Sequence, residues 1–379
     1  MRKHFSIVVC VAATLAGCKS SDSAYDGSPV DITPGKAAKP AETKVEVKEA
    51  KAPPPPKVKA SKAAVGRYAA MGEVVRLDPA LDALIAPDAK LERLAEGFNW
   101  SEGPVWVKDG NYVLFSDVPE NVIHKWSEKE GISIWLKPSG YTGAIPRIGG
   151  KGSNGLTLDS SGSLIVCQHG DRRIARLDKK GIFRPVVDRY EGKRLNSPND
   201  ACYRRNGDLY FTDPPYGLAG KDADPSKETP FNGVYRLAKN GELTVLVKGL
   251  TFPNGIGFSP DEKTLYVNVS DPAKPVIMAY DVKKDGSVEN GRLFFDCKPL
   301  QDAGGKGLPD GLKVDRKGNL FATAPGGVIV VSPEGVHLGT IATGQATGNC
   351  CWGEDGSVLY VTADMYLCRI QTKTKGSHY

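Results

Sequence analysis

The stretch Asp109-Gly110-Asn111-Tyr112-Val113-Leu114-Phe115 joins a tight polar turn to a run of β-forming residues. Five further copies of this turn and strand follow along the chain, at residues 161–166, 206–211, 261–267, 317–322 and 355–361. The copies are spaced about 38 to 56 residues apart, which is the length of a four-stranded propeller blade. The sequence therefore predicts an all-β fold, a six-bladed β-propeller, over residues 67–379.

The last repeat ends soon after Ile370, which is too early for a full set of strands. We therefore expect a strand from residues 91–96 to complete the sixth blade and close the ring. An open β-sandwich or two separate domains is the alternative. Six evenly spaced repeats favour a single ring.

Residues 1–17 have the features of a secreted lipoprotein signal peptide. Arg2 and Lys3 precede a short apolar run that ends at Leu15-Ala16-Gly17-Cys18. This ending resembles a bacterial lipobox, which implies cleavage before Cys18 and lipidation of that residue. An ordinary signal peptide with a chance cysteine is the alternative. Because Lys19 follows the cysteine, we expect an exported protein anchored at the periplasmic face of the outer membrane or at the cell surface.

Residues 18–66 are an Ala/Lys/Pro-rich linker that we expect to be a disordered N-terminal tail, because they hold too little apolar surface to offset the entropy of ordering. The formal charge of the chain is +6, and residues 19–66 hold nine lysines against six acidic residues. The remaining chain is close to neutral, so we expect no nucleic-acid partner. Membrane contact is expected through lipidated Cys18 only.

Six cysteines fall within the predicted propeller: Cys167, Cys202, Cys297, Cys350, Cys351 and Cys368. Some could pair in an oxidising compartment, but their spacing does not give a connectivity. None forms a CxxC zinc pattern. We expect most of them to be buried strand residues.

One position recurs where the innermost strand of each blade begins. Counting back eight residues from the second position of each turn gives Glu102, Asn154, Asn199, Asn254, Asp310 and Gly348. Each of these alone could be an ordinary turn residue. Their shared phase instead predicts a ring of oxygen-bearing side chains at one level of the channel. Such a set suits Ca²⁺, with Mg²⁺, Mn²⁺ or Zn²⁺ as alternatives, and its two carboxylates would repel each other without a cation.

Residues 91–371 resemble the family of gluconolactonases, senescence marker protein (regucalcin) and luciferin-regenerating enzyme, and are most similar to its bacterial gluconolactonase branch. The resemblance rests on Glu102-Gly103-Pro104, Ser197-Pro198-Asn199-Asp200, Pro253-Asn254-Gly255 and Pro309-Asp310-Gly311. It implies a lactonase-like propeller whose catalytic divalent metal is bound by Glu102, Asn199, Asn254 and Asp310. It also implies that Asn154 and His169 line the substrate pocket.

The resemblance further implies metal-dependent hydrolysis of a small lactone, such as the sugar lactone gluconolactone, by a carboxylic ester hydrolase. Asp310, Asp200 or His169 would act as general base, although His169 could be a plain loop residue. Tyr216 would wall the substrate pocket or brace its own loop. Residues 137–151 and 220–231 are candidate lids. The alternatives are the same metal site acting on other esters or organophosphates, and a propeller that only binds a ligand or protein.

Overall fold

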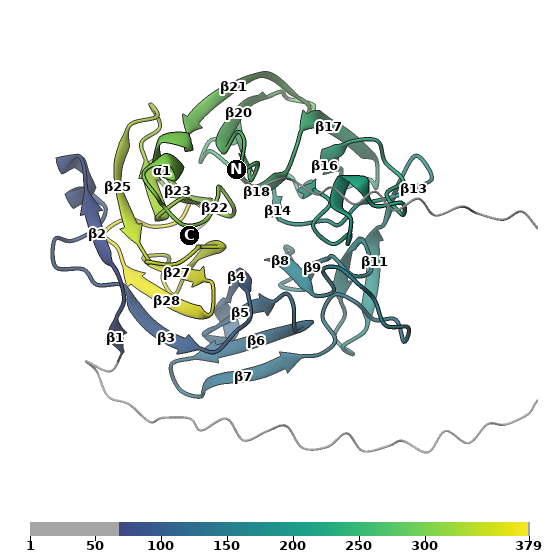
Figure 1. Cartoon of the computed structure of the whole chain (residues 1–379), viewed down its shortest axis with the longest axis horizontal. Coiled ribbons are helices and arrows are strands. Elements are labelled where there is room, and N and C mark those ends of the chain that lie inside the picture. Colours follow the sequence, from purple (N-terminus) through teal and green to yellow (C-terminus); the bar gives the residue numbers. More distant parts are fainter. Residues whose placement is uncertain (1–67, 378–379) are drawn as a thin grey trace, which may run out of the picture. The chain divides into compact units, whose positions relative to one another are not determined.

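The structure, a computed structural model, describes residues 68–377. The predicted signal peptide and linker lie outside the described residues. Within the described part, six antiparallel sheets follow one another around a central channel (Figure 1). The predicted all-β, six-bladed propeller is confirmed.

The first three blades consist of four strands each. Blade one contains β4 (Ser101–Val107), β5 (Tyr112–Asp117), β6 (Val122–Ser127) and β7 (Gly131–Leu136). Blade two contains β8 (Ser153–Leu158), β9 (Leu164–Gln168), β10 (Arg173–Leu177) and β11 (Phe183–Val187), followed by a short hairpin of β12 (Arg189–Tyr190) and β13 (Lys193–Arg194). Blade three contains β14 (Ala201–Tyr203), β15 (Leu209–Asp213), β16 (Asn232–Leu237) and β17 (Leu243–Leu250).

Of the last three blades, the fifth and sixth include strands from the N-terminal part of the described chain. Blade four contains β18 (Pro253–Phe258), β19 (Thr264–Val269), β20 (Val276–Val282) and β21 (Val288–Asp296). Blade five contains β22 (Leu312–Val314), β23 (Leu320–Ala324), β24 (Gly327–Val331), β25 (His337–Ala342) and β2 (Glu73–Arg76). Blade six contains β26 (Asn349–Gly353), β27 (Val358–Ala363), β28 (Tyr366–Gln371), β3 (Glu92–Glu96) and β1 (Ala69–Ala70).

Helices are short in the described part of the chain. They are α1 (Lys298–Asp302) and the 3₁₀ turns η1 (Pro79–Ala83), η2 (Lys108–Gly110) and η3 (Lys221–Ala223). No helix between residues 68 and 377 has the length and apolar character needed to cross a membrane.

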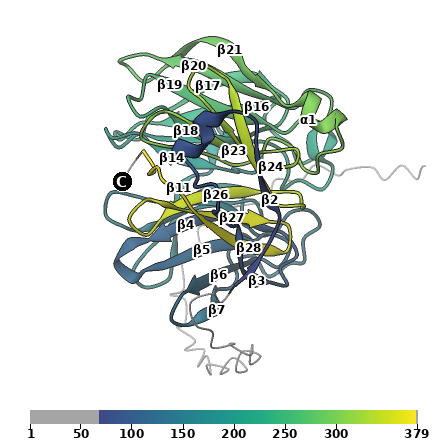
Figure 2. The ribbon, with the colours of Figure 1, turned by 90° about the vertical axis from the view of Figure 1, so that its left-hand side faces the viewer.

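Segments from near both ends of the described residues, 68–377, build blade six. β3 pairs antiparallel with β28, with Leu367 opposite Ala95, and Figure 2 shows the two strands side by side. This confirms that residues 91–96 close the ring. The sequence did not indicate β2, which adds a fifth strand to blade five by pairing with β25. The N-terminal part of the described chain therefore joins blades five and six.

The hydrophobic core is divided into six clusters, one in each gap between neighbouring blades. The side chains of successive residues in a middle strand pack into the clusters on opposite sides of the blade. In β15, Tyr210 packs toward blade four and Phe211 toward blade two. Because both faces of each middle strand are covered, these strands are continuously apolar rather than alternating.

The six cysteines between residues 68 and 377 are free thiols. Five are buried, and Cys202 is partly exposed. All but Cys297 lie in strands, which confirms the expectation that most are buried strand residues. Burial raises the pKa of the Cys350 thiol to about 12, so it stays protonated at neutral pH.

The closing strand should be needed for stability. Two truncated chains test this, one beginning at Lys90 and the other at Gly97, because only the first keeps β3. Loss of β3 uncovers the edge of β28 and removes Leu94 and Ala95 from the cluster between blades six and one. We expect the shorter chain to melt about 10 °C below the longer one in a thermal unfolding scan. Equal melting temperatures would show that the pairing of β3 with β28 does not stabilise the propeller.

Candidate metal centre

The positions singled out in the sequence lie at the inner end of each blade. Glu102, Asn154 and Asn254 are the second residues of β4, β8 and β18. Asn199 and Asp310 come two residues before β14 and β22. Figure 1 shows these five strands around the middle of the ring. The structure therefore brings all five side chains to the channel end of their blades.

Hydrogen bonds between neighbouring blades hold these positions at one level. The residue that follows a ring position often donates its backbone amide to the ring carbonyl of the next blade, as in Gly155 to Asn199 (2.7 Å), Gly255 to Asp310 (2.8 Å) and Gly311 to Gly348 (2.7 Å). Hydroxyl groups on the second strand of a blade also donate to the ring carbonyl of the next blade, as in Ser116 to Asn154 (2.8 Å), Thr212 to Asn254 (2.7 Å) and Thr323 to Gly348 (3.0 Å). The ring positions of neighbouring blades are therefore linked through their backbone carbonyl groups.

Glycine is required where blades meet this closely. A Cβ atom on Gly255 would lie 2.2 Å from the carbonyl oxygen of Asp310. A Cβ atom on Gly348 would lie 2.5 Å from Oε1 of Glu102. The absence of a side chain at the sixth ring position thus leaves room for the Glu102 carboxyl group.

The ring holds carboxyl groups whose protonation is strongly perturbed. Burial raises the pKa of Glu102 to about 7, with a further contribution from the negative charge of Asp200. Burial and the charges of Glu102 and Asp200 raise the pKa of Asp310 well above its usual value. The predicted repulsion between carboxylates is therefore present, and a cation at this level would relieve it.

Three buried amide oxygens of the ring accept no hydrogen bond from any group between residues 68 and 377: Asn154 Oδ1, Asn199 Oδ1 and Asn254 Oδ1. The Glu102 carboxyl group has only the Asp310 carboxyl group as a further partner at Oε1. The amide nitrogen of Asn254 donates to Ser270 Oγ (2.9 Å), and that of Asn199 lies 3.5 Å from His169 Nε2. These contacts leave the amide oxygens to another partner. Buried acceptors without a donor are rare, and a bound cation would satisfy them.

This set fits a hard cation better than zinc. Among residues 68–377, no group of three or more His, Cys, Asp or Glu side chains is arranged to hold a metal. A cation at the ring would therefore depend on amide oxygens as well as on Glu102 and Asp310. That combination suits Ca²⁺, whereas Zn²⁺ prefers imidazole and thiolate ligands.

The predicted substrate residues surround the same end of the channel. His169 directly follows β9 and is 2% exposed, and burial lowers its pKa to about 3. Tyr216 follows β15 and stacks on Phe252 with 5.5 Å between ring centroids. Burial and the charge of Asp310 raise the pKa of the Tyr216 hydroxyl. His169 and Tyr216 therefore adjoin the ring, in which Asn154 is the blade-two position.

Asp200 lies one residue beyond the ring and makes different contacts. Its Oδ1 accepts from the Ala201 amide (2.8 Å), and its Oδ2 lies 3.4 Å from Asn349 Nδ2. The same Asn349 nitrogen lies 3.3 Å from Glu102 Oε2. The sequence did not single out Asn349, because the repeat position in blade six falls on Gly348 and the position after it is not an amide in the other blades.

The segment between β7 and β8 covers the His169 side of the site. Arg147 donates to the carbonyl oxygens of Gly170 and Gly217, which belong to loops of blades two and three. Gly150 approaches closely enough that a Cβ atom would lie 3.4 Å from His169 Nδ1. Part of the candidate lid 137–151 therefore lies next to His169, and its role as a lid stays a prediction.

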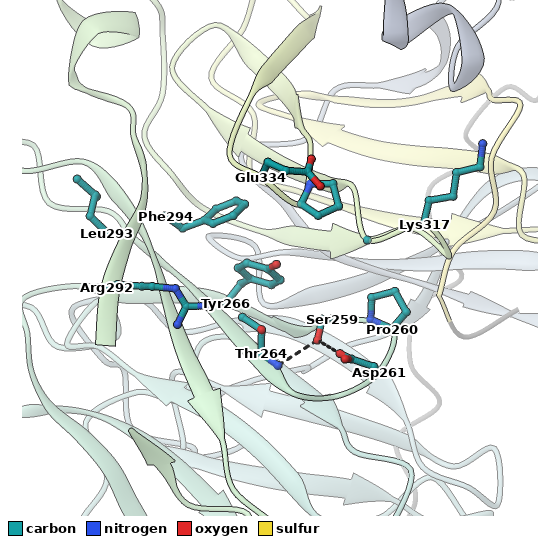
Figure 3. Close-up of a pocket in the computed structure, with 12 residues that line it drawn as sticks. Ser259, Pro260, Asp261, Thr264, Tyr266, Arg292, Leu293, Phe294, Lys317 and Glu334 are labelled. Carbon is teal, nitrogen blue, oxygen red and sulfur yellow. Dashed lines mark hydrogen bonds between the residues drawn. The ribbon is translucent and has the colours of Figure 1, made fainter. Parts of the chain in front are cut away.

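Away from the channel, a pocket of about 500 Å³ lies between blades four and five (Figure 3). It contains no ring residue. A hydrogen bond from the Ser259 hydroxyl lowers the pKa of Asp261, and one from Ser332 lowers the pKa of Glu334. The pKa values of these two acids are lowered, whereas burial raises those of Glu102 and Asp310 in the channel. Raised values of this kind mark reactive sites, so the channel is the candidate centre.

The fold and the site together define a class, the six-bladed propellers with carboxylate and amide oxygens gathered at one end of the channel. Residues 100–364 match the family model described as the SMP-30/Gluconolactonase/LRE-like region. The chain belongs to this family, which confirms the resemblance found in the sequence.

Similar proteins include enzymes and solved structures. The chain is 44% identical over 312 residues to the gluconolactonase of Zymomonas mobilis subsp. mobilis, covering 81% of this chain and 88% of that protein. It is 26% identical over 270 residues to the pentonolactonase XacC of Haloferax volcanii, covering 69% and 80%. The solved structure of a gluconolactonase from Xanthomonas campestris is 33% identical, with a TM-score of 0.69, and covers 80% of this chain and 97% of that one.

Proposed function

We propose that this protein is a carboxylic ester hydrolase that opens a small lactone at a divalent cation in the propeller channel. Its first candidate substrate is a sugar lactone, since the similar proteins are named as a gluconolactonase and a pentonolactonase. The proposed cation is Ca²⁺, bound by Glu102, Asn199, Asn254 and Asp310. The observation that carries the proposal is the set of buried ring oxygens that accept no hydrogen bond within the described chain.

The ring residues would divide the chemistry as follows. When bound, the cation supplies Lewis-acid polarisation of the ester carbonyl and offsets the charge that develops on its oxygen. The carboxylate of Asp310 would accept a proton from the water that attacks the carbonyl carbon, and would return it to the ring oxygen that leaves when the ester C–O bond breaks. A general base of this kind contributes about 10²- to 10⁴-fold to the rate.

The remaining pocket residues orient the substrate. His169 has a neutral ring at physiological pH because burial lowers its pKa to about 3, so it offers a hydrogen bond rather than a charge. Asn154 and Tyr216 stand beside the ring and would contact sugar hydroxyl groups. Arg147 ties residues 137–151 across two loops and would set the size of lactone that fits.

The proposal includes a cellular location. We propose that residues 1–17 direct export and that lipidated Cys18 anchors the propeller at the periplasmic face of the outer membrane or the cell surface. Mass spectrometry of the mature N-terminus tests this. A diacylated or triacylated cysteine is expected, and an unmodified N-terminus at another residue would contradict it.

Calcium affinity should depend on pH with a definite sign. In the metal-free protein the pKa of Glu102 is raised to about 7, and only the ionised carboxylate binds a cation. Below this value each bound ion must displace at least one proton, because the pKa of the second carboxyl ligand, Asp310, is raised as well. Kd should therefore rise at least tenfold per pH unit as pH falls. Calorimetric titration across this range checks the slope. A pH-independent Kd would contradict the assignment.

Chelation followed by substrate screening tests the function itself. The purified protein should hydrolyse sugar lactones, lose activity after dialysis against a chelator, and regain it with Ca²⁺. A panel of aryl esters and organophosphates, run in the same buffers, shows whether another ester is preferred. Hydrolysis of no member of the panel, with or without metal, would favour a propeller that only binds.

A further inference from the structure

The channel widens below the ring into a cavity of about 1640 Å³. The residues three positions after each ring position all line it: Val105, Thr157, Cys202, Gly257, Lys313 and Cys351. Lys313, on β22, is the one charged residue at this level. A lysine facing the inside of a channel needs an electrostatic reason, because an uncompensated ammonium group there is costly.

Lys313 is connected to the ring through one amide side chain. Its Nζ donates to the Leu312 carbonyl oxygen (2.8 Å) and lies 3.5 Å from Asn349 Oδ1. The nitrogen of the same Asn349 amide lies 3.3 Å from Glu102 Oε2 and 3.4 Å from Asp200 Oδ2. The ammonium group and two carboxylates therefore share a single bridging side chain.

The ammonium group of Lys313 carries its charge in this setting. Burial lowers the pKa of Lys313, but the carboxylate of Asp200 raises it, and the net direction is upward. The charge of Lys313 also acts on Glu102, whose pKa it lowers. The carboxylates at and next to the ring and the ammonium group of Lys313 therefore favour each other's charged forms.

A count of charges indicates what this ammonium group does. The ring and the level beneath it hold three carboxylates, Glu102, Asp200 and Asp310, and both of the others raise the pKa of Asp310. One divalent cation supplies two positive charges and leaves one negative charge over. Lys313 supplies the third. Charges this close to a bound ion change how strongly an ion of a given charge is held.

We propose that the positive charge of Lys313 balances the one negative charge that a divalent ion leaves in the channel. This counter-cation lowers the affinity for the divalent ion, and it lowers the affinity for ions of higher charge even more. This rests on the proposed metal site at the ring. Lys313 acts through Asn349 and Asp200 and touches neither the ion nor the substrate, so it is a positioning residue.

Calorimetric titration of CaCl₂, with competition by TbCl₃, tests the proposal. Lys313→Met removes the charge and keeps the length. Calcium affinity should rise about tenfold, and terbium affinity about thirtyfold, because Coulomb energy scales with the charge of the ion. Lys313→Arg keeps the charge and should bind both ions as the parent does. The matched control is Lys239→Met, an exposed lysine at the mouth of the same cavity, which should change neither affinity.

Asp200→Asn provides a second variant with the opposite sign. It removes one negative charge from the same level and should weaken calcium binding about tenfold. The double variant Lys313→Met/Asp200→Asn should return close to the parent affinity, because the charge balance is restored. The calcium affinities of Asp200→Asn and of the double variant still test the charge balance if Lys313→Met alone folds poorly.

The outcomes separate the two proposals. If the parent protein binds no metal, the proposed metal site fails. If the parent binds one ion and folded Lys313→Met binds calcium and terbium with unchanged or weaker affinity, the counter-cation is refuted and the metal site stands.

Discussion

Asp310→Asn should reduce kcat for lactone hydrolysis by about 10³-fold or more, because it removes both a ligand charge and the proposed general base. The substitution keeps the shape of the side chain, so the loss should not reflect unfolding. Metal-free Asp310→Asn should even melt at the same temperature as the parent or above it, because the charges of Glu102 and Asp200 already oppose ionisation of Asp310.

Steady-state kinetics and thermal unfolding of the same samples check this prediction. The matched control is Asp261→Asn, the same chemical change at an exposed acid of the pocket between blades four and five (Figure 3). That variant should keep the parent kcat. Activity within tenfold of the parent in Asp310→Asn would remove Asp310 from both roles.

Gly255→Ala should weaken calcium binding about 100-fold or more and lower the melting temperature, although it adds only one methyl group. The added Cβ atom would lie 2.2 Å from the Asp310 carbonyl oxygen, so the backbone of blade five must move. That movement breaks the hydrogen bond from Gly255 to Asp310 and displaces a proposed ligand. A shift of about 1 Å at such a site is enough to cost 10²-fold.

Gly249→Ala is the control for this prediction. Gly249 lies in β17, has no atom within 4 Å of the position its Cβ would take, and does not have a positive φ angle. Its substitution should leave calcium binding unchanged. Similar calcium affinities for the two glycine variants would show that ring spacing does not control the site.

The sequence was sufficient to predict the number of blades because each blade repeats the same turn and apolar strand. It also predicted the closing strand, since the sixth repeat lacked one. It did not predict β2, whose partner β25 lies more than 260 residues away and whose four residues, Glu73–Arg76, alternate only weakly in burial. Pairings of this length are selected by the packed fold rather than by local preference.

The ring positions could be predicted for a different reason. Their phase within the repeat is fixed by the innermost strand, so Glu102 and Asp310 could be placed at one level before any contact was known. The residues beneath the ring could not be predicted. Asn349 and Lys313 look like ordinary strand residues in the sequence. Only the packed channel reveals that Asn349 contacts Glu102 and that Lys313 brings a positive charge close to Asn349. Such partners depend on side-chain directions that no short pattern encodes.

The cysteines show the same limit. Their spacing left several pairings open, and the described structure keeps all six as free thiols. Cys350 and Cys351 are adjacent in β26 but belong to different core clusters, one on each side of blade six. Alternation along a strand separates neighbours in sequence, which explains why proximity in the chain says little about pairing.

The most direct measurement is the position of a bound ion. Crystals grown with Mn²⁺ or Tb³⁺ in place of Ca²⁺ allow the ion to be located by anomalous scattering. We expect one peak per chain, at about 2.2 to 2.6 Å from oxygens of Glu102, Asn199, Asn254 and Asp310. A peak elsewhere in the propeller, or none in crystals of protein that hydrolyses lactones, would contradict the metal centre.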